Sequence, residues 1–294
     1  MPATIIDGKV IADQIKDEVR QQTDRLKRER GITPGLAFIL VGEDDPASQV
    51  YVRSKGKACE EMGFHSVTER LPASVSQQEL LILINRFNAD PAIHGILVQL
   101  PLPPHIDEDT IIEAIDYRKD VDGFHPINVG KLVIGQDCLR PCTPAGIQEM
   151  LVRSGNDPSG KHVVVVGRSN IVGKPIMNIL LQKQRGANAV VTIAHTGTSD
   201  IASFTRQADI VIAAIGKPEA ITGDMLKQGC VVIDVGINRI QDPAAKNGSR
   251  IVGDVHFASA VKVAKAITPV PGGVGPMTIA MLMKNTLQAA TPAR

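Results

Sequence analysis

The stretch that most constrains the fold runs from His162 to Pro175 and reads HVVVVGRSNIVGKP. The four valines at 163–166 are typical of a strand buried on both faces, as in a parallel sheet. Gly167 and Gly173 flank a turn, and residues 171–184 continue with helical spacing. A strand, a glycine turn and a helix bring backbone N–H groups and a positive helix end together, which suits the pyrophosphate of a dinucleotide. The spacing is G-x-S-x-x-x-G rather than G-x-G-x-x-G, so the stretch alone is equally compatible with an ordinary strand–turn–helix crossover.

Composition limits the class of protein. With 294 residues, 43% of them hydrophobic, the chain can form two domains with sizeable cores. A net charge of +1 and an aromatic content of 3% without Trp argue against nucleic-acid and membrane partners. Four cysteines without C-x-x-C spacing indicate free thiols in a reducing compartment. The sequence shows no secretory signal and no apolar stretch of membrane-spanning length, so we expect a cytoplasmic protein.

The first part of the chain alternates between helical and strand patterns. Amphipathic or polar-flanked segments predict helices at 10–30, 47–63 and 77–88, and apolar runs predict strands at 36–42, 64–70 and 93–99. This alternation predicts a parallel α/β domain. Glycine, proline and aspartate predict a loop over residues 119–132, KDVDGFHPINVGKL.

A second α/β series follows a boundary near Cys142. Thr143 before Pro144 predicts a helix start, with Thr143 as the N-cap. Apolar runs predict strands at 163–166, 190–194, 210–215 and 231–235. The last predicted helix, 277–289, can pack on either domain. The expected fold class is therefore α/β, with two α/β domains; the family resemblance described below implies that they flank a cleft.

Tyr51 and Lys55 are four residues apart on a predicted helix, so they share one face. A lysine beside a phenol in a cleft can have a lowered pKa and take part in proton transfer. The alternative is a surface lysine next to a half-buried tyrosine. Tyr-x-x-x-Lys also marks short-chain dehydrogenases, but there the glycine loop precedes the pair, and here it follows.

Gln99 and the KDVDGF segment are further candidates. Gln99 ends a buried strand, where ligands of parallel sheets bind, so it can contact a ligand, orient Lys55 or merely cap a loop. Asp120 and Asp122 can accept paired N–H groups from a ring, or belong to a solvated Asp-Gly turn. His94 and His125 lack partners at metal-ligand spacing, and we interpret both as structural; no metal is expected.

Residues 267–278, ITPVPGGVGPMT, contain three prolines and three glycines. This composition predicts a loop of fixed shape with accessible backbone amides, although a plain linker has a similar composition.

Eight segments in order resemble one family, the bifunctional methylenetetrahydrofolate dehydrogenase/methenyltetrahydrofolate cyclohydrolases in their compact bacterial form. The segments span nearly the whole chain and read YVRSKGKACEEMGF, GILVQLPLP, KDVDGFHPINVGKL, RPCTPAGI, VVVVGRSNIVGKP, VIDVGINR, VGDV and ITPVPGGVGPMT. The resemblance implies oxidation of 5,10-methylenetetrahydrofolate with NADP and hydrolysis of the methenyl product to 10-formyltetrahydrofolate. It also implies a homodimer, a folate/catalytic domain of residues 1–141 plus 277–294, and a Rossmann-like NADP-binding domain of residues 142–276.

The resemblance also assigns roles to residues. Lys55 matches the lysine that assists hydrolysis, Gln99 the glutamine that positions it, and Asp122 the carboxylate that grips the pterin. Tyr51 matches a tyrosine that stacks on the folate. The other matched positions line the folate or bind the cofactor: Val98, Leu100, Pro269, Gly272 and Gly273 for the folate, and Gly167, Arg168, Ser169, Gly173, Thr196 and Ile237 for the cofactor.

NADP is favoured over NAD because no acidic residue sits at the tip of the second strand of the series, and Arg168 in the glycine turn can pair with a 2′-phosphate. The chain departs from the family at Thr196-Gly197, where Ser followed by Lys or Arg is common, so use of NAD stays open. Two other functions remain to be distinguished by assay: an enzyme with only one of the two activities, and a non-catalytic nucleotide-binding regulator.

Overall fold

The computed structural model describes residues 3–42, 46–243 and 248–291, with the backbone alone for 46–53. It divides into two compact units, which we name by their sheets. The small-sheet unit comprises Asp13–Cys142 and Ile279–Arg294, and the large-sheet unit comprises Met1–Ala12 and Thr143–Thr278. Each unit is described separately below.

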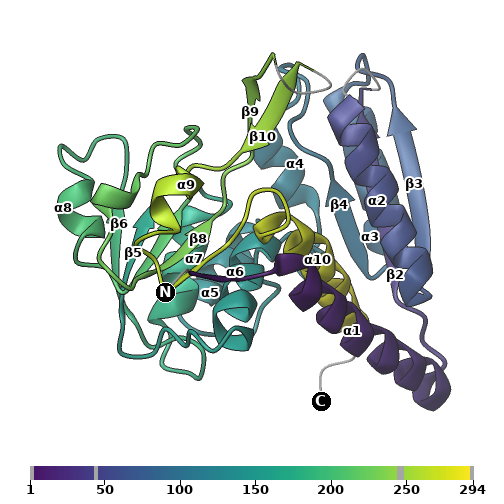
Figure 1. Cartoon of the computed structure of the whole chain (residues 1–294). Coiled ribbons are helices and arrows are strands. Elements are labelled where there is room, and N and C mark those ends of the chain that lie inside the picture. Colours follow the sequence, from purple (N-terminus) through teal and green to yellow (C-terminus); the bar gives the residue numbers. More distant parts are fainter. Residues whose placement is uncertain (1–2, 43–45, 244–247, 292–294) are drawn as a thin grey trace. The chain divides into compact units, whose positions relative to one another are not determined.

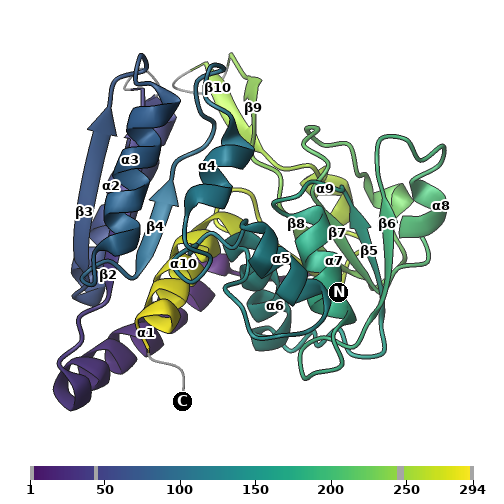
Figure 2. The same cartoon turned by 180° about the vertical axis from the view of Figure 1, so that it is seen from behind.

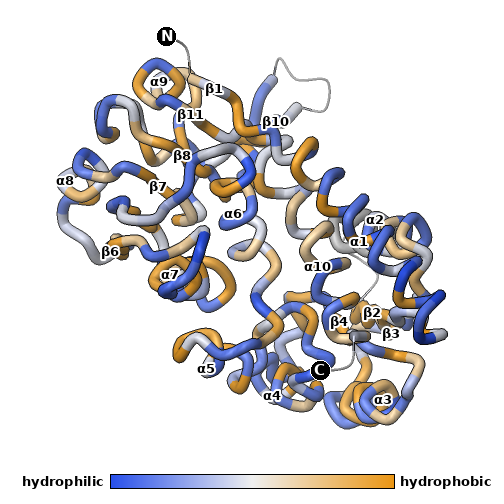
Figure 3. The backbone as a smooth tube through the Cα atoms, turned by 90° about the horizontal axis from the view of Figure 1, so that it is seen from below, coloured by the Kyte–Doolittle hydropathy of each residue, from blue (hydrophilic) through white to orange (hydrophobic). Residues whose placement is uncertain are grey.

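The small-sheet unit is built on a parallel sheet of three strands in the order β3-β2-β4. The strands are β2 (Gly35–Val41), β3 (His65–Leu71) and β4 (Gly95–Val98). All seven residues of β2 are buried, as expected for a central strand with apolar side chains on both faces. Figure 3 colours much of β2 and β4 as hydrophobic. The three strands predicted in this half of the sequence are therefore confirmed, with β4 shorter than expected.

Helices cover both faces of this sheet. In Figure 1 α2 (Pro46–Met62) lies in front of the strands, and from behind, in Figure 2, α3 (Gln77–Ala89) lies in front. Helix α3 begins with a capping box, in which Glu79 N donates to Ser76 Oγ at 3.2 Å and Ser76 N donates to the Glu79 carboxylate at 2.9 Å. The other helices of this unit are α1 (Gly8–Arg30, from Asp13 onward), α4 (Glu108–Ala114), α5 (Pro126–Val133) and α10 (Val274–Ala290, from Ile279 onward).

The large-sheet unit contains six parallel strands in the order β1-β11-β8-β7-β5-β6. The strands are β1 (Thr4–Ile5), β5 (His162–Val166), β6 (Val190–Ala194), β7 (Ile210–Ala213), β8 (Val231–Asp234) and β11 (Ala266–Ile267). From β5 the chain crosses to β6 on one side and then returns to β7 on the other. This reversal creates a topological switch point at the carboxyl end of β5, where open α/β sheets bind ligands.

Helices and one hairpin complete the large-sheet unit. The helices are α6 (Cys142–Arg153, from Thr143 onward in this unit), α7 (Gly173–Leu181), α8 (Ala202–Thr205), the 3-10 helix η1 (Gly223–Met225) and α9 (Phe257–Ala260). Strands β9 (Asn238–Gln241) and β10 (Ser249–Val252) form a separate antiparallel pair.

The loop predicted over residues 119–132 was wrong in its second half, where α5 forms. The His125 ring accepts a hydrogen bond from Ile127 N at 3.0 Å, and Pro126 occupies the first turn. Proline lacks the N–H group that a first turn leaves unpaired, so it favours this position rather than breaking the helix. Glycine and proline content therefore concealed a helix start.

Two predicted helix boundaries also shift. Helix α6 begins at Cys142, so Thr143 lies inside it rather than capping it, and its hydroxyl contacts the Thr278 hydroxyl at 2.9 Å. Helix α7 is shorter than the predicted 171–184, because residues 182–189 turn toward β6. No helix in the described ranges is both long and apolar enough to cross a membrane.

Candidate active site

Lys55 and Gln99 meet in the small-sheet unit. Lys55 lies on α2 with 4% of its surface exposed, and its Nζ donates to Gln99 Oε1 at 3.1 Å. Gln99 follows β4, where its backbone N–H donates to Ile39 O at 2.9 Å and its Nε2 to Leu100 O at 2.8 Å. The amide of Gln99 is therefore fixed at both ends, and its oxygen must face Lys55.

Burial changes the acid–base behaviour of Lys55. Desolvation lowers the pKa of its ammonium, and the opposite effect of nearby Asp122 and Cys142 is smaller. A lysine with a lowered pKa carries a larger fraction of neutral amine near neutral pH, which suits it to accept and return protons.

Asp120 organises the loop beside this lysine. Its carboxylate is 2% exposed and accepts the backbone N–H groups of Gly123, Phe124 and His125 at 3.1, 3.2 and 2.8 Å. It also accepts Asn128 Nδ2 at 2.9 Å. Asp120 is therefore a structural carboxylate that shapes the turn around its neighbour.

Asp122 is presented by that turn. It is half-buried, and within the described ranges no hydrogen bond or ion pair engages its carboxylate. Desolvation raises its pKa to about 6, against the opposing effect of Lys55. An acceptor carboxylate without a partner among the described residues is suited to a ligand that carries N–H donors.

Asn285 on α10 also stabilises this loop. The sequence analysis did not identify it. Its Nδ2 donates to Val121 O and Arg140 O, both at 2.8 Å, and lies 3.6 Å from Cys142 Sγ. The Cys142 thiol contacts Val121 O at 3.4 Å, and burial raises its pKa well above the usual range. The one sequence signal is a polar run, Lys284–Thr286, which follows the apolar residues 279–283 of the last predicted helix.

The remaining predicted folate positions divide between the units. Val98 and Leu100 flank Gln99 in the small-sheet unit. Pro269, Gly272 and Gly273 belong to the large-sheet unit, where Gly272 O accepts the Gly8 N–H at 3.0 Å. Tyr51 belongs to α2, but its side chain lies outside the described residues.

The glycine turn after β5 forms a cradle in the large-sheet unit. Gly167 has φ of +138°, and a Cβ there would lie 2.1 Å from Ala214 O. A Cβ on Gly173 would lie 2.3 Å from Gly167 O. Both positions therefore require glycine, because the backbones approach too closely for any side chain.

The backbone N–H groups available for a ligand are not those at the start of α7, where the sequence predicted them. Ser169 Oγ accepts Gly173 N at 3.3 Å, Ser169 O accepts Lys174 N at 3.0 Å, and Pro175 has no N–H, so the first turn of α7 is already satisfied. In the part of the chain that the structure describes, no hydrogen bond engages the backbone N–H groups of residues 168–171. The loop before the helix, rather than the helix end, offers the donors that a pyrophosphate needs.

The other predicted cofactor positions surround this turn within the same unit. Arg168 and Thr196 are exposed, the latter in the loop after β6, and Ile237 is 68% exposed after β8. All three follow strands that end at the carboxyl edge of the sheet, so they can contact one ligand there.

Neither histidine singled out above is arranged as a metal ligand. His94 Nδ1 accepts Gly35 N at 3.0 Å, and His125 caps α5. The described residues contain no group of three His, Cys, Asp or Glu side chains that could hold a metal ion. The four cysteines are free thiols.

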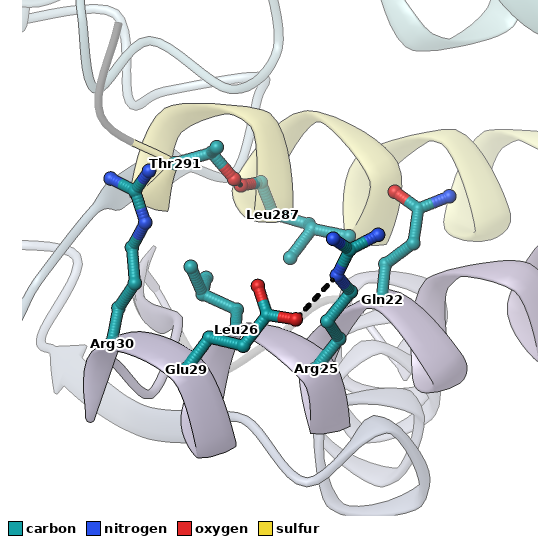
Figure 4. Close-up of a pocket in the computed structure, with 7 residues that line it drawn as sticks. All are labelled: Gln22, Arg25, Leu26, Glu29, Arg30, Leu287 and Thr291. Atoms are coloured by element: carbon teal, nitrogen blue, oxygen red, sulfur yellow. Dashed lines mark hydrogen bonds and ion pairs between the residues drawn. The ribbon is translucent and has the colours of Figure 1, made fainter. Parts of the chain in front are cut away.

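Figure 4 shows a groove between α1 and α10 in the small-sheet unit. Arg25 Nε and Glu29 Oε1 form an ion pair across one turn of α1 at 2.8 Å. None of the predicted site residues lines the groove, so we do not place the chemistry there. The lining residues are Gln22, Arg25, Leu26, Glu29, Arg30, Leu287 and Thr291.

Comparisons with known proteins identify the family of the chain. Residues 6–122 match the family model for the tetrahydrofolate dehydrogenase/cyclohydrolase catalytic domain, and residues 141–294 match the model for the NAD(P)-binding domain of the same family. The chain is 62% identical over 290 residues to the bifunctional protein FolD of Moorella thermoacetica, covering 99% of each.

Solved structures are similar over almost the whole chain. The bifunctional FolD enzyme of Campylobacter jejuni has 50% identity and a TM-score of 0.91, with 98% of both chains covered. The Trypanosoma brucei enzyme, solved with NADP cofactor and an inhibitor, has 43% identity and a TM-score of 0.91, covering 99% of this chain and 98% of that one.

Proposed function

The chain belongs to the tetrahydrofolate dehydrogenase/cyclohydrolase family, and from that premise we propose which residues perform its reactions. It is a bifunctional enzyme with methylenetetrahydrofolate dehydrogenase and methenyltetrahydrofolate cyclohydrolase activities. It oxidises 5,10-methylenetetrahydrofolate and hydrolyses the methenyl product to 10-formyltetrahydrofolate. Lys55, Gln99 and Asp122 are the proposed core of the folate chemistry.

For the oxidation, the protein's task is alignment. The methylene carbon lies between two nitrogens, so a nitrogen lone pair assists departure of the hydride and no strong base is needed. Asp122 accepts N–H groups of the pterin through its unpaired carboxylate. Tyr51 stacks on the ring, and the backbones of Val98, Leu100, Pro269, Gly272 and Gly273 line the folate.

For the hydrolysis, Lys55 handles the proton. The methenyl product is a resonance-stabilised cation, and a protonated lysine near that cation is disfavoured, which adds to the effect of burial on the pKa. The neutral amine assists removal of a proton from the attacking water. Gln99 Oε1, which accepts from Lys55 Nζ, sets the direction of the amine.

NADP is the proposed cofactor, and when bound it supplies the hydride acceptor. The cradle at Gly167 and Gly173 fits its pyrophosphate, and so do the backbone N–H groups of residues 168–171, which have no partner among the described residues. Arg168 is placed to pair with the 2′-phosphate, while Ser169, Thr196 and Ile237 complete the contacts. Because Thr196-Gly197 offers no second cation for the 2′-phosphate, we propose that NAD can also serve as a cofactor.

We propose further that the enzyme is a cytoplasmic homodimer. Support comes from the family resemblance. The functional domains we propose are residues 1–141 plus 277–294 for the folate and 142–276 for NADP.

The observation that carries this proposal is the buried Lys55, hydrogen-bonded to Gln99 and near Asp122, whose carboxylate has no partner among the residues that the structure describes. The test is a spectrophotometric assay with methylenetetrahydrofolate and each nicotinamide cofactor, following nicotinamide reduction and methenyl accumulation together. Lys55→Met should retain hydride transfer, lose hydrolysis by a factor on the order of 100 or more, and accumulate methenyltetrahydrofolate.

The matched control is Lys57→Met. Lys57 lies on the same helix with 75% of its side chain exposed, 3.8 Å from Glu61. That variant should keep both activities. Hydrolysis at the wild-type rate in Lys55→Met would remove Lys55 from the mechanism, and failure of the wild type to reduce either cofactor would refute the dehydrogenase assignment.

A further inference from the structure

Two buried carboxylates at the carboxyl edge of the large sheet have no role in the chemistry described so far. Asp234 ends β8 and is 4% exposed, and Asp254 follows β10 and is 0% exposed. Burying a carboxylate is costly unless hydrogen bonds compensate for the lost water. The hydrogen-bond donors that contact these two carboxylates therefore indicate their structural role.

The Asp254 carboxylate connects two loops. Its Oδ2 accepts the backbone N–H groups of Ile215 and Gly216, both at 2.8 Å, in the loop after β7. Its Oδ1 accepts Asn238 Nδ2 at 2.8 Å. Asn238 directly follows Ile237, a proposed cofactor contact after β8.

Asp234 fixes Asp254 in turn. Its Oδ1 accepts Gly236 N at 3.0 Å and Asp254 N at 2.9 Å, and its Oδ2 accepts Val255 N at 3.0 Å. The glycines of this region leave space for the two carboxylates. A Cβ on Gly253 would lie 1.8 Å from Asp234 Oδ2, and one on Gly236 would lie 2.3 Å from Asp254 Oδ1.

The same loop touches the glycine turn. Ala214, one residue before Ile215, places its carbonyl where a Cβ of Gly167 would be, at 2.1 Å. Strands β5 and β7 are neighbours, so this contact lies at the switch point of the sheet. A continuous set of contacts thus runs from Asp254 through residues 214–216 to the Gly167 turn.

We propose that Asp254 is a positioning residue of the dinucleotide site. Its carboxylate holds the loop after β7 and the residue after Ile237 in the arrangement that the cofactor requires, and Asp234 holds Asp254. Loops that are ordered before binding lose less conformational entropy when the ligand binds, so their fixation raises affinity without any direct contact. The inference rests on the proposed cofactor site.

The main test is Asp254→Asn in the full chain. The variant has nearly the same shape, but its amide keeps one acceptor oxygen and turns an NH2 group toward a donor, either the loop N–H groups or Asn238. The dissociation constant of NADPH, measured by fluorescence titration, should rise by about tenfold or more. Binding of a non-reacting tetrahydrofolate analogue should not change, a difference that general loss of structure would not produce.

Two further variants separate positioning from stability. Asn238→Ala removes one of the three donors and leaves Asp254 in place, so the NADPH dissociation constant should rise by about two- to tenfold. Asp209→Asn is the matched control, because this carboxylate also accepts a backbone N–H, from His162 at 3.0 Å, but precedes β7 at the opposite edge of the same sheet. It should leave NADPH binding unchanged.

Several outcomes would contradict the inference. A folded Asp254→Asn that binds NADPH like the wild type, or that loses both ligands equally, overturns the inference. If that variant does not fold, unchanged NADPH binding in Asn238→Ala overturns it instead. A wild-type protein that does not bind NADPH refutes the proposed cofactor site itself, and the inference with it.

Discussion

Lys55 and Asp122 show how one physical cause acts on two charges of opposite sign. Desolvation disfavours the charged form of each, so it lowers the pKa of the Lys55 ammonium and raises that of the Asp122 carboxyl to about 6. Each charge partly opposes the shift of the other. The result is a lysine that releases its proton more easily than usual and a carboxylate that is still ionised at neutral pH.

The raised pKa of Asp122 predicts a pH dependence of folate binding. Only the ionised carboxylate accepts two N–H groups, so affinity should be full above about pH 6 and fall as the pH drops through 6. Below that point the dissociation constant of a non-reacting tetrahydrofolate analogue should rise about tenfold per pH unit. An aspartate at its ordinary pKa of 3.8 would show this change only near pH 4.

Asp122→Asn supplies the reference for that titration, because it retains the ligand's own protonation and the shape of the residue. Its affinity should be low at every pH and free of the break near 6. A variant with the same break as the wild type would assign the titration to another group.

At the scale of elements, the position of the loop that carries Asp122 depends on α10, a helix distant from it in sequence. Asn285 of α10 donates to Val121 O and Arg140 O, on the loop that carries Asp122 and on the segment that leads into α6. The loop also packs closely against the segment before α6. A Cβ on Gly123 would lie 2.5 Å from Pro141 N, so this close approach requires glycine. The position of Asp122 is therefore fixed by long-range hydrogen bonds as well as by its own turn.

Asn285→Leu should lower the free energy of unfolding by about 2–4 kcal/mol, because it removes the buried hydrogen bonds that Asn285 Nδ2 donates to the Val121 and Arg140 carbonyls. The KM for methylenetetrahydrofolate should rise as Asp122 moves, while NADPH affinity stays constant. Denaturant unfolding and steady-state kinetics measure the two effects.

Gln288→Leu provides the comparison on the same helix. Gln288 is exposed and its longer bonds, 3.4 Å to Asp137 and to Cys138 O, are expected to contribute little. A folded Asn285→Leu variant with the wild-type KM for folate would show that the loop keeps its shape without α10.

At the scale of the whole molecule, each of the two units contains a hydrophobic core cluster made of its own residues. A ligand that binds one unit stabilises that unit by mass action, by about 2.7 kcal/mol at 100 times its dissociation constant. NADP should therefore slow hydrogen exchange in β5 and β7 by about 100-fold under conditions where exchange follows unfolding of the unit. Exchange in β2, in the small-sheet unit, should slow less.

Hydrogen-exchange mass spectrometry of the full chain measures both sheets in one experiment. Sodium sulfate at matched ionic strength controls for nonspecific salt effects. Equal slowing in β2 and β7 would contradict separate unfolding of the two units.

The local pattern of the sequence was sufficient to place most elements of both sheets. The valines at 163–166 and the apolar run at 36–41 form buried strands, because burial on both faces requires uninterrupted apolar residues. Family motifs added the names of candidate site residues, and the Lys55–Gln99 hydrogen bond connects two of them. Composition failed at α5, where proline and histidine start a helix in a segment that resembled a loop.

By itself, the sequence determined that this is a two-domain α/β enzyme of the tetrahydrofolate dehydrogenase/cyclohydrolase family, because hydrophobic periodicity, glycine turns and ordered motifs are local features of the sequence. Only the tertiary structure decided which hydrogen bonds position the loop that carries Asp122 and the loop after β7. The Asn285–Val121 bond joins residues 164 positions apart, and Asp254 reaches Ile215 across 39. Such contacts follow from how whole elements pack, and a local pattern records burial and turns but not the partner that a buried polar group will find.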